Sequence, residues 1–272
     1  HQNGFIEISC LVDNQNVISH YDIFRSLRGY NSFYKIGEIQ ASVGDNIYYI
    51  DKDAMSNVNS YTYKIFPVDT CGSRLSPPSS LNLDHVNDTS FATTILLNVE
   101  SNIDYNDIIF TDEYTNTITF NEYDDWLGSV SEYRLFRSVN SQPFNLLPLY
   151  VWDRINNPEE ELRYIDIVTE FGDGNGRFCY YVQAIEGNNM SFGPTLEGSY
   201  SNISCVSQTP IIFIPSVFTP NNDDHNEVFI PITYFVSSEG YSFSVYNRYG
   251  TILFTTMDPE KVIEPTKIVI EI

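Results

Sequence analysis

Residues 19–26 read SHYDIFRS, and residues 131–138 repeat the pattern as SEYRLFRS. Two further segments recur in the same order along the chain: YID at 49–51 returns at 164–166, and YTYKIFPV at 61–68 corresponds to FCYYVQAI at 178–185. The spacing between matching segments changes by only a few residues, as insertions in loops between strands would cause. The pattern predicts two copies of one structural unit.

Each copy has the side-chain periodicity of β-strands. Ile118 and Phe120 alternate with threonine and asparagine, the period of two that is typical of half-buried strands. Turns rich in glycine and asparagine separate such segments, for example GDGNG at 172–176. The only helical candidate, residues 151–162, is interrupted by Pro158. These features predict an all-β chain built from two-sheet sandwiches.

Further detail in these units points to a known type of sandwich. A Tyr-x-Tyr strand at 61–63 is followed by CGSRLSPPS at 71–79. These residues match the sixth strand of fibronectin type III domains and its turn into the seventh, and the region of Trp126 resembles the end of that family's second strand. Both units therefore resemble fibronectin type III domains, which are immunoglobulin-like β-sandwiches.

Proline and polar residues interrupt the strand pattern near residues 84 and 209, where we expect domain boundaries. The first sandwich would then cover residues 1–84, beginning late and leaving little room for a first strand. The second sandwich would cover residues 85–209. A small β domain of the sandwich type is expected over residues 210–272.

The C-terminal segment carries two motifs, IPSVFTPNNDDHNEVF at 214–229 and YNRYGTILF at 246–254. In this order they resemble the gliding-motility-associated C-terminal domain, which is the type B sorting domain of the type IX secretion system. Tyr249 stands where that family has tryptophan, and the family's Trp-Asp-Gly and closing strand have no counterpart before Ile272. We therefore expect the closing hairpin of this domain to be missing.

The resemblance implies a protein that is exported through the periplasm to the cell surface or the medium. Its last domain would be the address read by the type IX translocon in the outer membrane and by an outer-membrane β-barrel partner, and the sandwiches would be a spacer. The residues that match the family's motifs are the candidates for this recognition: Phe218, Thr219, Pro220, Asn221, Asp223, Asn226, Tyr246, Asn247, Arg248 and Gly250.

A physical route to recognition follows from the missing hairpin. Strands expected at 211–217 and 230–236 would leave a sheet edge with few protecting charges, and such an edge accepts a strand from another chain. Phe218 and Arg248 would add side-chain contacts to this pairing. For Arg248, the alternative is a structural ion pair within the small sheet.

Charge and hydropathy restrict the partners. The formal net charge is −22 and the isoelectric point is near 4.2, which argues against binding nucleic acids or anionic membranes by non-specific attraction. No stretch of about eighteen apolar residues occurs, so no membrane-spanning helix is expected. The chain begins His1-Gln2 without a methionine or signal peptide, which we interpret as a mature product or a fragment.

Four cysteines are present, and no two of them form a Cys-x-x-Cys pair. By the fibronectin resemblance, Cys179 lies early in the sixth strand of the second unit and Cys205 late in its seventh strand. Antiparallel neighbours can bring such positions within disulfide distance. Cys10 and Cys71 would then pair by exclusion. The alternative is four buried thiols, and an exported protein favours the disulfides.

The loop at 221–227, NNDDHNE, has six oxygen-bearing side chains in seven positions. Calcium takes six to eight oxygen ligands, so Asn221, Asp223 and Asn226 are candidate calcium ligands. The alternative is a set of Asx-turns, in which Asn and Asp side chains bond their own backbone. We expect His225 to be a surface residue of this loop and expect no other cofactor.

Candidate catalytic groups are few. Asp124 and Asp125 beside Trp126, or the glutamates at 159–161, could serve as acids at a sugar site, but adjacent carboxylates diverge instead of facing each other across a cleft. The four histidines lie in no zinc-binding spacing, and no nucleophile or phosphate-loop motif is present. We do not expect an enzyme. The alternative function is an adhesin or carbohydrate-binding module that uses exposed tyrosines, and a glycosidase is a distant third.

Arg25 and Arg137 occupy the same position of the repeat. The first interpretation is a surface arginine that stacks on a tyrosine or pairs with an acid. The second is a ligand contact that is repeated in each unit.

Overall fold

The computed structural model describes residues 4–11, 18–41, 46–74, 91–102, 113–124, 126, 129–187, 198–216, 219, 227–259 and 261. Within these ranges the chain is all β, and the only helical element is one turn of 3-10 helix, η1 (Thr169–Phe171). The predicted all-β fold is confirmed. Residues 151–162, the helical candidate, complete a strand and then form turns.

The first sandwich consists of two antiparallel sheets. Its larger sheet has the order β3-β2-β5-β6, and its smaller sheet pairs β1 with β4. The strands are β1 (Ile6–Leu11), β2 (Ile18–Leu27), β3 (Tyr34–Gln40), β4 (Asn46–Asp51), β5 (Tyr61–Asp69) and β6 (Phe91–Thr93).

The core of this sandwich is small and follows the alternation of the strands. In β5, Tyr61 and Tyr63 are buried while Thr62 and Lys64 lie on the more open face. Their rings pack with Ile6 of β1 and Ile23 of β2, so both sheets contribute to one apolar cluster. The period of two in the sequence therefore marks the inward-facing residues.

The second sandwich repeats this arrangement with more strands. One sheet has the order β11-β8-β7, and the other has the order β10-β9-β12-β13, with β14 also paired to β12. The strands are β7 (Leu97–Ser101), β8 (Thr115–Phe120), β9 (Val130–Val139), β10 (Tyr150–Asp153), β11 (Arg163–Ile167), β12 (Arg177–Glu186), β13 (Gly198–Tyr200) and β14 (Ser204–Ser207). The repeated segments of the sequence occupy equivalent strands: β2 and β9, β4 and β11, and β5 and β12.

The core of the second sandwich is larger and centres on Trp152 of β10, which is fully buried. Its ring meets Phe120 edge-on at 5.0 Å and Tyr150 at 4.8 Å, an arrangement that aromatic pairs favour. Trp126, expected at the end of a strand, instead lies after β8 in the connection to β9 and is only partly buried.

Both predicted domain boundaries differ from the sheets. β6 pairs with β5, so the first sandwich extends to Thr93, beyond the boundary expected at residue 84. Ile211 and Phe235 belong to the core of the second sandwich, although both lie beyond residue 209. The reason is that a strand pattern ends where the chain turns, whereas a domain ends where the packing ends.

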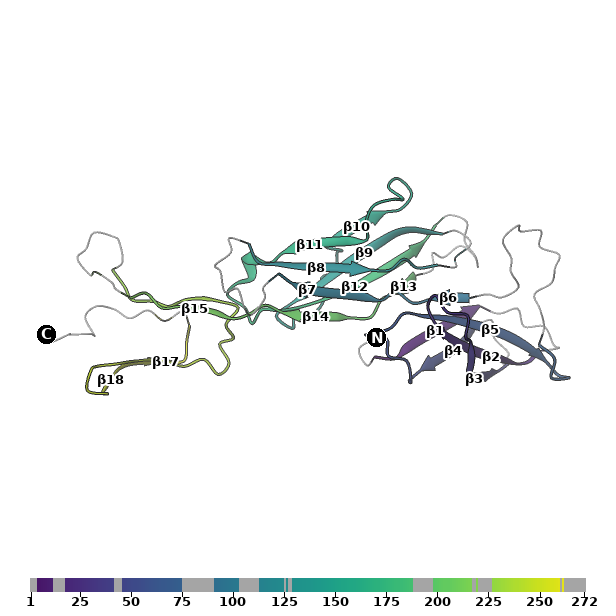
Figure 1. Cartoon of the computed structure of the whole chain (residues 1–272), viewed down its shortest axis with the longest axis horizontal. Helices are drawn as coiled ribbons and strands as arrows, with labels where there is room; N and C mark the ends of the chain where they lie inside the picture. The colour runs from purple at the N-terminus through teal and green to yellow at the C-terminus, as the bar shows by residue number, and fades with distance from the viewer. Residues whose placement is uncertain are drawn as a thin grey trace.

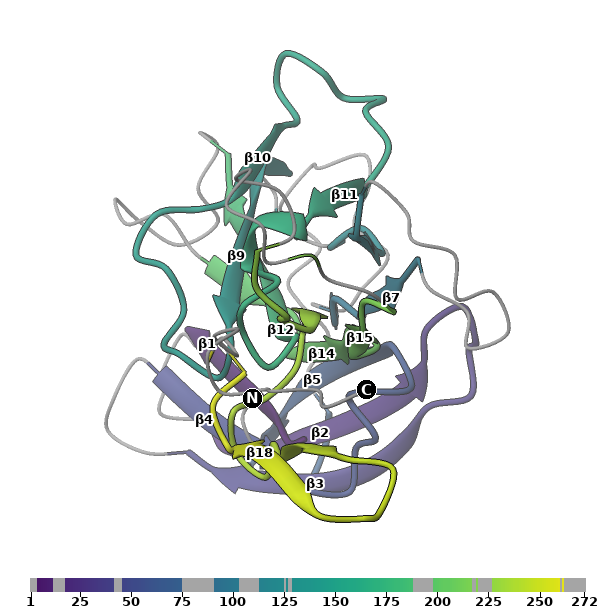
Figure 2. The same ribbon diagram turned by 90° about the vertical axis from the view of Figure 1, so that its left-hand side faces the viewer.

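Two hairpins follow the second sandwich. The first pairs β15 (Ile211–Phe213) with β16 (Ile232–Tyr234), and the second pairs β17 (Phe243–Tyr246) with β18 (Ile252–Thr256). Figure 1 shows β17 and β18 at the opposite end of the molecule from the first sandwich. Figure 2, with that hairpin toward the viewer, shows the first sandwich below the second.

Candidate functional site

The hairpin β17–β18 carries the YNRYG motif at its tip. The Asn247 side-chain oxygen accepts hydrogen bonds from the backbone N–H groups of Tyr249 and Thr251, both at 2.9 Å. The Gly250 N–H donates to the Asn247 carbonyl at 3.0 Å, and Gly250 has φ +82°, which favours glycine. Asn247 and Gly250 are therefore required by the turn itself.

The other residues of the motif are presented to solvent. Tyr246 is 55% exposed and Tyr249 is 78% exposed. The Arg248 guanidinium lies 5.0 Å from the centre of the Tyr249 ring, a cation–π contact. Within the part of the chain that the structure describes, Arg248 has no salt bridge, so the alternative interpretation, an ion pair within the small sheet, is not found there. Arg248 and Tyr249 form an exposed pair at the tip.

Most residues of the other motif lie outside the described ranges. Thr219 is described and is exposed. The remaining candidates of that motif, including all three candidate calcium ligands, lie outside the described residues: Phe218, Pro220, Asn221, Asp223 and Asn226. The expectations for calcium and for His225 stay predictions.

The segment before the exposed hairpin is anchored to the second sandwich. Phe235 is buried, meets Tyr114 edge-on at 5.1 Å and donates its N–H to the Gly172 carbonyl at 2.6 Å. Its φ of +57° is unusual for a bulky residue. Gly176 lies so close that a Cβ there would be 2.8 Å from the Phe235 Cβ. This contact fixes where the C-terminal hairpins leave the sandwich.

No protein-family model and no curated protein sequence matches the chain. Among the described residues, no helix combines the length and apolarity needed to cross a membrane.

The repeated arginines form buried ion pairs. Arg25 donates from Nη1 to Asp51 at 2.7 Å, and the Tyr63 hydroxyl donates to the same carboxylate at 2.7 Å. The second sandwich has the equivalent set, in which Arg137 and the Tyr180 hydroxyl both donate to Asp166. The predicted pairing with an acid is confirmed, but these arginines are buried, not on the surface.

Aromatic rings complete each of these clusters. Arg25 lies 5.0 Å from the Tyr61 ring centre, and Arg137 lies 4.6 Å from that of Phe171. Burial alone would lower the pKa of Arg25, but its hydrogen bonds with Tyr34 and Asp51 outweigh this and raise the pKa. Burial and the neighbouring carboxylates raise the pKa of Tyr63 and of Tyr180. The clusters are core ion pairs, closed to a ligand.

One of the two expected disulfides is present. Cys179 of β12 and Cys205 of β14 are opposite each other in the sheet and are bonded. Cys10 and Cys71 are not joined to each other: Cys10 lies on β1 in the smaller sheet of the first sandwich, and Cys71 lies exposed in the turn after β5. Pairing by exclusion was wrong because it takes no account of where the fold places each residue: Cys10 lies within a strand, whereas Cys71 lies in an exposed turn.

The carboxylates considered for catalysis have structural partners. Asp124 pairs with Arg28 at 2.5 Å, and Glu160 accepts a hydrogen bond from the Tyr150 hydroxyl at 2.7 Å. Asp125 lies outside the described residues, and the pocket beside Glu159 and Glu160 is a surface hollow next to β10. These contacts do not set two carboxylates across a cleft.

A further group, His20, Asp22 and Glu38, lies on the larger sheet of the first sandwich with its ligand atoms within 4.8 Å. Lys35 pairs with both Asp22 and Glu38, and Arg74 pairs with Asp22. Burial would raise the pKa of Asp22, but the two cations outweigh it and lower the pKa. Because these cations already neutralise Asp22, the group is a poor metal site.

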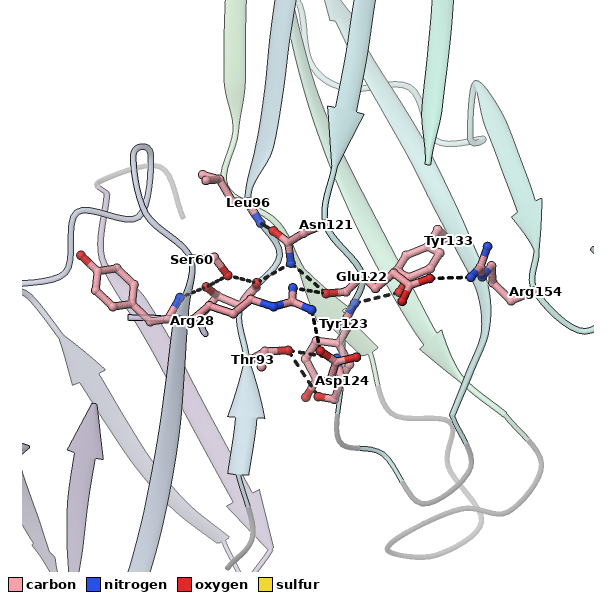
Figure 3. Close-up of polar contacts among 12 residues, drawn as sticks. Arg28, Ser60, Thr93, Leu96, Asn121, Glu122, Tyr123, Asp124, Tyr133 and Arg154 are labelled. Atoms are coloured by element: carbon pink, nitrogen blue, oxygen red, sulfur yellow. Dashed lines mark hydrogen bonds and ion pairs between the residues drawn. The ribbon is translucent and has the colours of Figure 1, made fainter. Parts of the chain in front are cut away.

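The junction between the sandwiches was not anticipated from the sequence. Arg28, just after β2, donates to the Glu122 carbonyl and to Asp124 of the second sandwich, as Figure 3 shows. The Ser60 hydroxyl donates to the Thr94 carbonyl at 2.7 Å, and the Asp124 N–H donates to the Thr93 hydroxyl at 2.9 Å. Short-range periodicity contains no signal for such contacts between distant loops.

The connection between the sandwiches is bonded from both sides. Asn121 accepts a hydrogen bond from the Leu96 N–H at 2.8 Å (Figure 3). It also donates to the Thr94 carbonyl at 3.0 Å. Asn202 forms the same kind of paired contact with the N–H and carbonyl of Leu97, at 2.7 and 3.0 Å. With its backbone groups satisfied in this way, the linker behaves as part of the second sandwich and not as a flexible tether.

Proposed function

We propose that this chain is part of an exported cell-surface protein, in which two β-sandwiches form a stiff spacer and the C-terminal hairpin is a sorting signal for type IX secretion. The observation that carries the proposal is the exposed Arg248–Tyr249 pair on the YNRYG turn. This turn lies at the far end of the molecule from the first sandwich (Figure 1).

Three features support this assignment. The motif resembles that of type B sorting domains. In it, Asn247 and Gly250 form the turn, while Tyr246 and Tyr249 are exposed, as a recognition tip requires. The bonded junction limits bending between the sandwiches, which suits a spacer. The Cys179–Cys205 disulfide fits a protein that passes through an oxidising compartment.

The partner would be the translocon and an outer-membrane β-barrel that reads this tip. A cationic guanidinium stacked on an exposed tyrosine gives both a charge and an apolar face at one point of the surface. The preceding hairpin also has exposed apolar side chains, among them Ile212 of β15 and Ile232 of β16. Binding here would combine the Arg248–Tyr249 tip with strand pairing at the hairpin edge.

The test is a secretion assay in a type IX-competent cell, with a fluorescent reporter fused in front of the whole chain. We expect reporter at the surface or in the medium only when the translocon is intact. Replacing both Arg248 and Tyr249 with alanine should leave the reporter in the periplasm. The matched control is Tyr30→Ala, which removes a tyrosine of the first sandwich that is 66% exposed.

Two results would count against the proposal. Export of the Arg248/Tyr249 variant at the unmodified level would show that the tip is not the signal. Retention of the unmodified fusion in the periplasm, with the chain folded, would show that this chain is not a sorting signal.

A further inference from the structure

A cleft of about 330 Å³ lies at the junction of the sandwiches and shares Thr93 and Tyr123 with the contacts drawn in Figure 3. One wall comes from β1, β4 and β6, and the other comes from β13, Tyr123 and Trp126. The volume lies at the lower end of the range for small-molecule sites, about 300–1,000 Å³. A ligand in this cleft would contact both sandwiches at once.

Aromatic side chains line the cleft from both sandwiches. Tyr48 of β4 is 54% exposed, and Tyr200 of β13 is 50% exposed. Trp126 packs against Tyr123, with ring centroids 4.3 Å apart. Large rings left half open to water lose the stabilisation that burial would provide, unless a ligand covers them. The C–H face of a sugar ring provides such a cover, because it is flat and apolar while the ring's edge carries hydroxyls.

Polar groups lie beside these rings. Burial and the nearby Glu7 carboxylate of β1 raise the pKa of the Tyr48 phenol. Ser9, two residues after Glu7 on β1, is also exposed, and Ser9 and Ser199 of β13 both line the cleft. These side chains supply donors and acceptors in the same cleft, as a ligand rich in hydroxyls requires.

Charge narrows the ligand class. Of the described residues that line the cleft, none is lysine, arginine or histidine, and Glu7 is an acid. The chain as a whole has a formal net charge of −22. An anionic ligand would therefore meet repulsion without a compensating cation, which disfavours it.

Hydrogen bonds at the junction fix the relative position of the two walls of the cleft before any ligand binds. Arg28 and Ser60 of the first sandwich bond the Glu122 carbonyl and the Thr94 carbonyl across the junction. Little ordering would then be needed on binding, and the entropic cost of binding is correspondingly low.

We propose that this cleft binds a neutral saccharide of one or two rings, held between Tyr48 of the first sandwich and Trp126 and Tyr200 of the second. Glu7 and Ser9 hydrogen-bond its hydroxyls. This activity is separate from sorting, and it makes the pair of sandwiches a ligand-binding unit as well as a spacer.

The experiment titrates the whole 272-residue chain with cellobiose, maltose, lactose and N,N′-diacetylchitobiose while tryptophan fluorescence is recorded. The chain has two tryptophans, and Trp152 is fully buried, so a saturable change on adding sugar reports on Trp126. Isothermal titration calorimetry gives the affinity. D-glucuronic acid and a proline-rich peptide are titrated in parallel as ligands of other classes.

We expect saturable binding of at least one of the neutral disaccharides. Tyr48→Ala, Tyr200→Ala and Glu7→Gln should each weaken it about tenfold, the effect of losing one good contact. Tyr30→Ala, outside the cleft, should leave it unchanged. Thermal unfolding checks the fold of each variant, and Tyr48→Phe, which removes only the hydroxyl, replaces Tyr48→Ala if that variant is unfolded.

The proposal is overturned if none of the four sugars binds. It is also overturned if binding survives the Tyr48, Tyr200 and Glu7 substitutions, since the sugar would then bind elsewhere. Preferential binding of glucuronic acid or of the peptide would assign the cleft to another class of ligand. None of these results bears on secretion, so the sorting proposal is tested separately.

Discussion

Arg137 donates from Nη1 to both carboxylate oxygens of Asp166, at 2.7 and 2.9 Å, with both side chains buried. Arg25 and Asp51 form the equivalent contact in the first sandwich. In each sandwich the pair joins an inner strand of one sheet to the opposite sheet. The first pair joins β2 to β4, and the second joins β9 to β11. The two sheets are therefore connected by charge as well as by apolar packing.

Asp166→Ala should lower the free energy of unfolding of the second sandwich by about 3–5 kcal/mol, because Arg137 would remain buried without its counter-ion. Denaturant unfolding measures the change. Glu161→Ala, an exposed position before β11, is the control and should change stability by less than about 0.5 kcal/mol.

A double replacement separates charge burial from loss of volume. Arg137→Met combined with Asp166→Leu removes both charges together and should recover most of the stability lost in Asp166→Ala, since an apolar pair of similar size is often neutral. If the double variant is no more stable than Asp166→Ala, the unpaired charge is not the cause of the loss.

Alkaline pH should destabilise the fold once it rises above the ordinary tyrosine pKa of 10.0. Burial raises the pKa of Tyr133 from 10.0 to about 12. When the pKa of a tyrosine is higher in the folded state, the tyrosine contributes its full stabilisation of the fold below pH 10. This contribution is lost as the pH rises towards 12, because the unfolded chain releases the proton at the lower pH. Tyr63 and Tyr180 shift in the same direction.

Tyrosinate absorbance, recorded together with circular dichroism, checks this. The exposed tyrosines should ionise first, and a second group should ionise only as the β signal is lost. Ionisation of all twenty tyrosines in one step near pH 10, with the fold intact, would contradict the expectation.

Removal of the Cys179–Cys205 disulfide should cost about 3–4 kcal/mol in the chain-entropy account for a sequence separation of 26. The measurement is denaturant unfolding with and without a reductant. The double variant Cys179→Ser/Cys205→Ser should unfold at the same denaturant concentration under both conditions. If reductant destabilised this variant as much as it destabilises the unmodified chain, the redox-sensitive bond would not be Cys179–Cys205.

Phe235→Ala should release the C-terminal hairpins from the second sandwich. The ring contacts Tyr114 and Phe178, and its removal should cost about 3–5 kcal/mol of packing. In limited proteolysis we expect faster cleavage after residue 211, while residues 97–207 stay protected.

Gly176→Ala provides an independent test of the same contact. A Cβ at this position would lie 2.8 Å from the Phe235 Cβ, and Gly176 has φ +70°, so both crowding and backbone strain act there. Gly240→Ala is the matched control: it has φ +80° and open space around its Cβ position, so it tests strain alone. Equal sensitivity of the two variants to protease would mean that the contact with Phe235 is unimportant.

Much of the fold could be predicted from the sequence, because a strand records its buried face in every second residue. The repeat of SHYDIFRS and SEYRLFRS predicted two similar units, and these segments are β2 and β9 in the structure. The Cys179–Cys205 bond was also predictable, since it links neighbouring antiparallel strands of one sheet. In the YNRYG motif, asparagine and glycine already indicated a turn.

Tertiary packing decided the rest, because it depends on which residues meet across layers and not on local periodicity. The repeated Arg, Asp and Tyr lie in three separate segments, and only the stacking of two sheets brings Arg137, Asp166 and Tyr180 together. Packing also placed Phe235 in the second sandwich, and it put Cys10 on a strand and Cys71 in an exposed turn. The cleft at the junction exists for the same reason: its walls come from strands that are distant in the sequence and are joined by Arg28 and its partners.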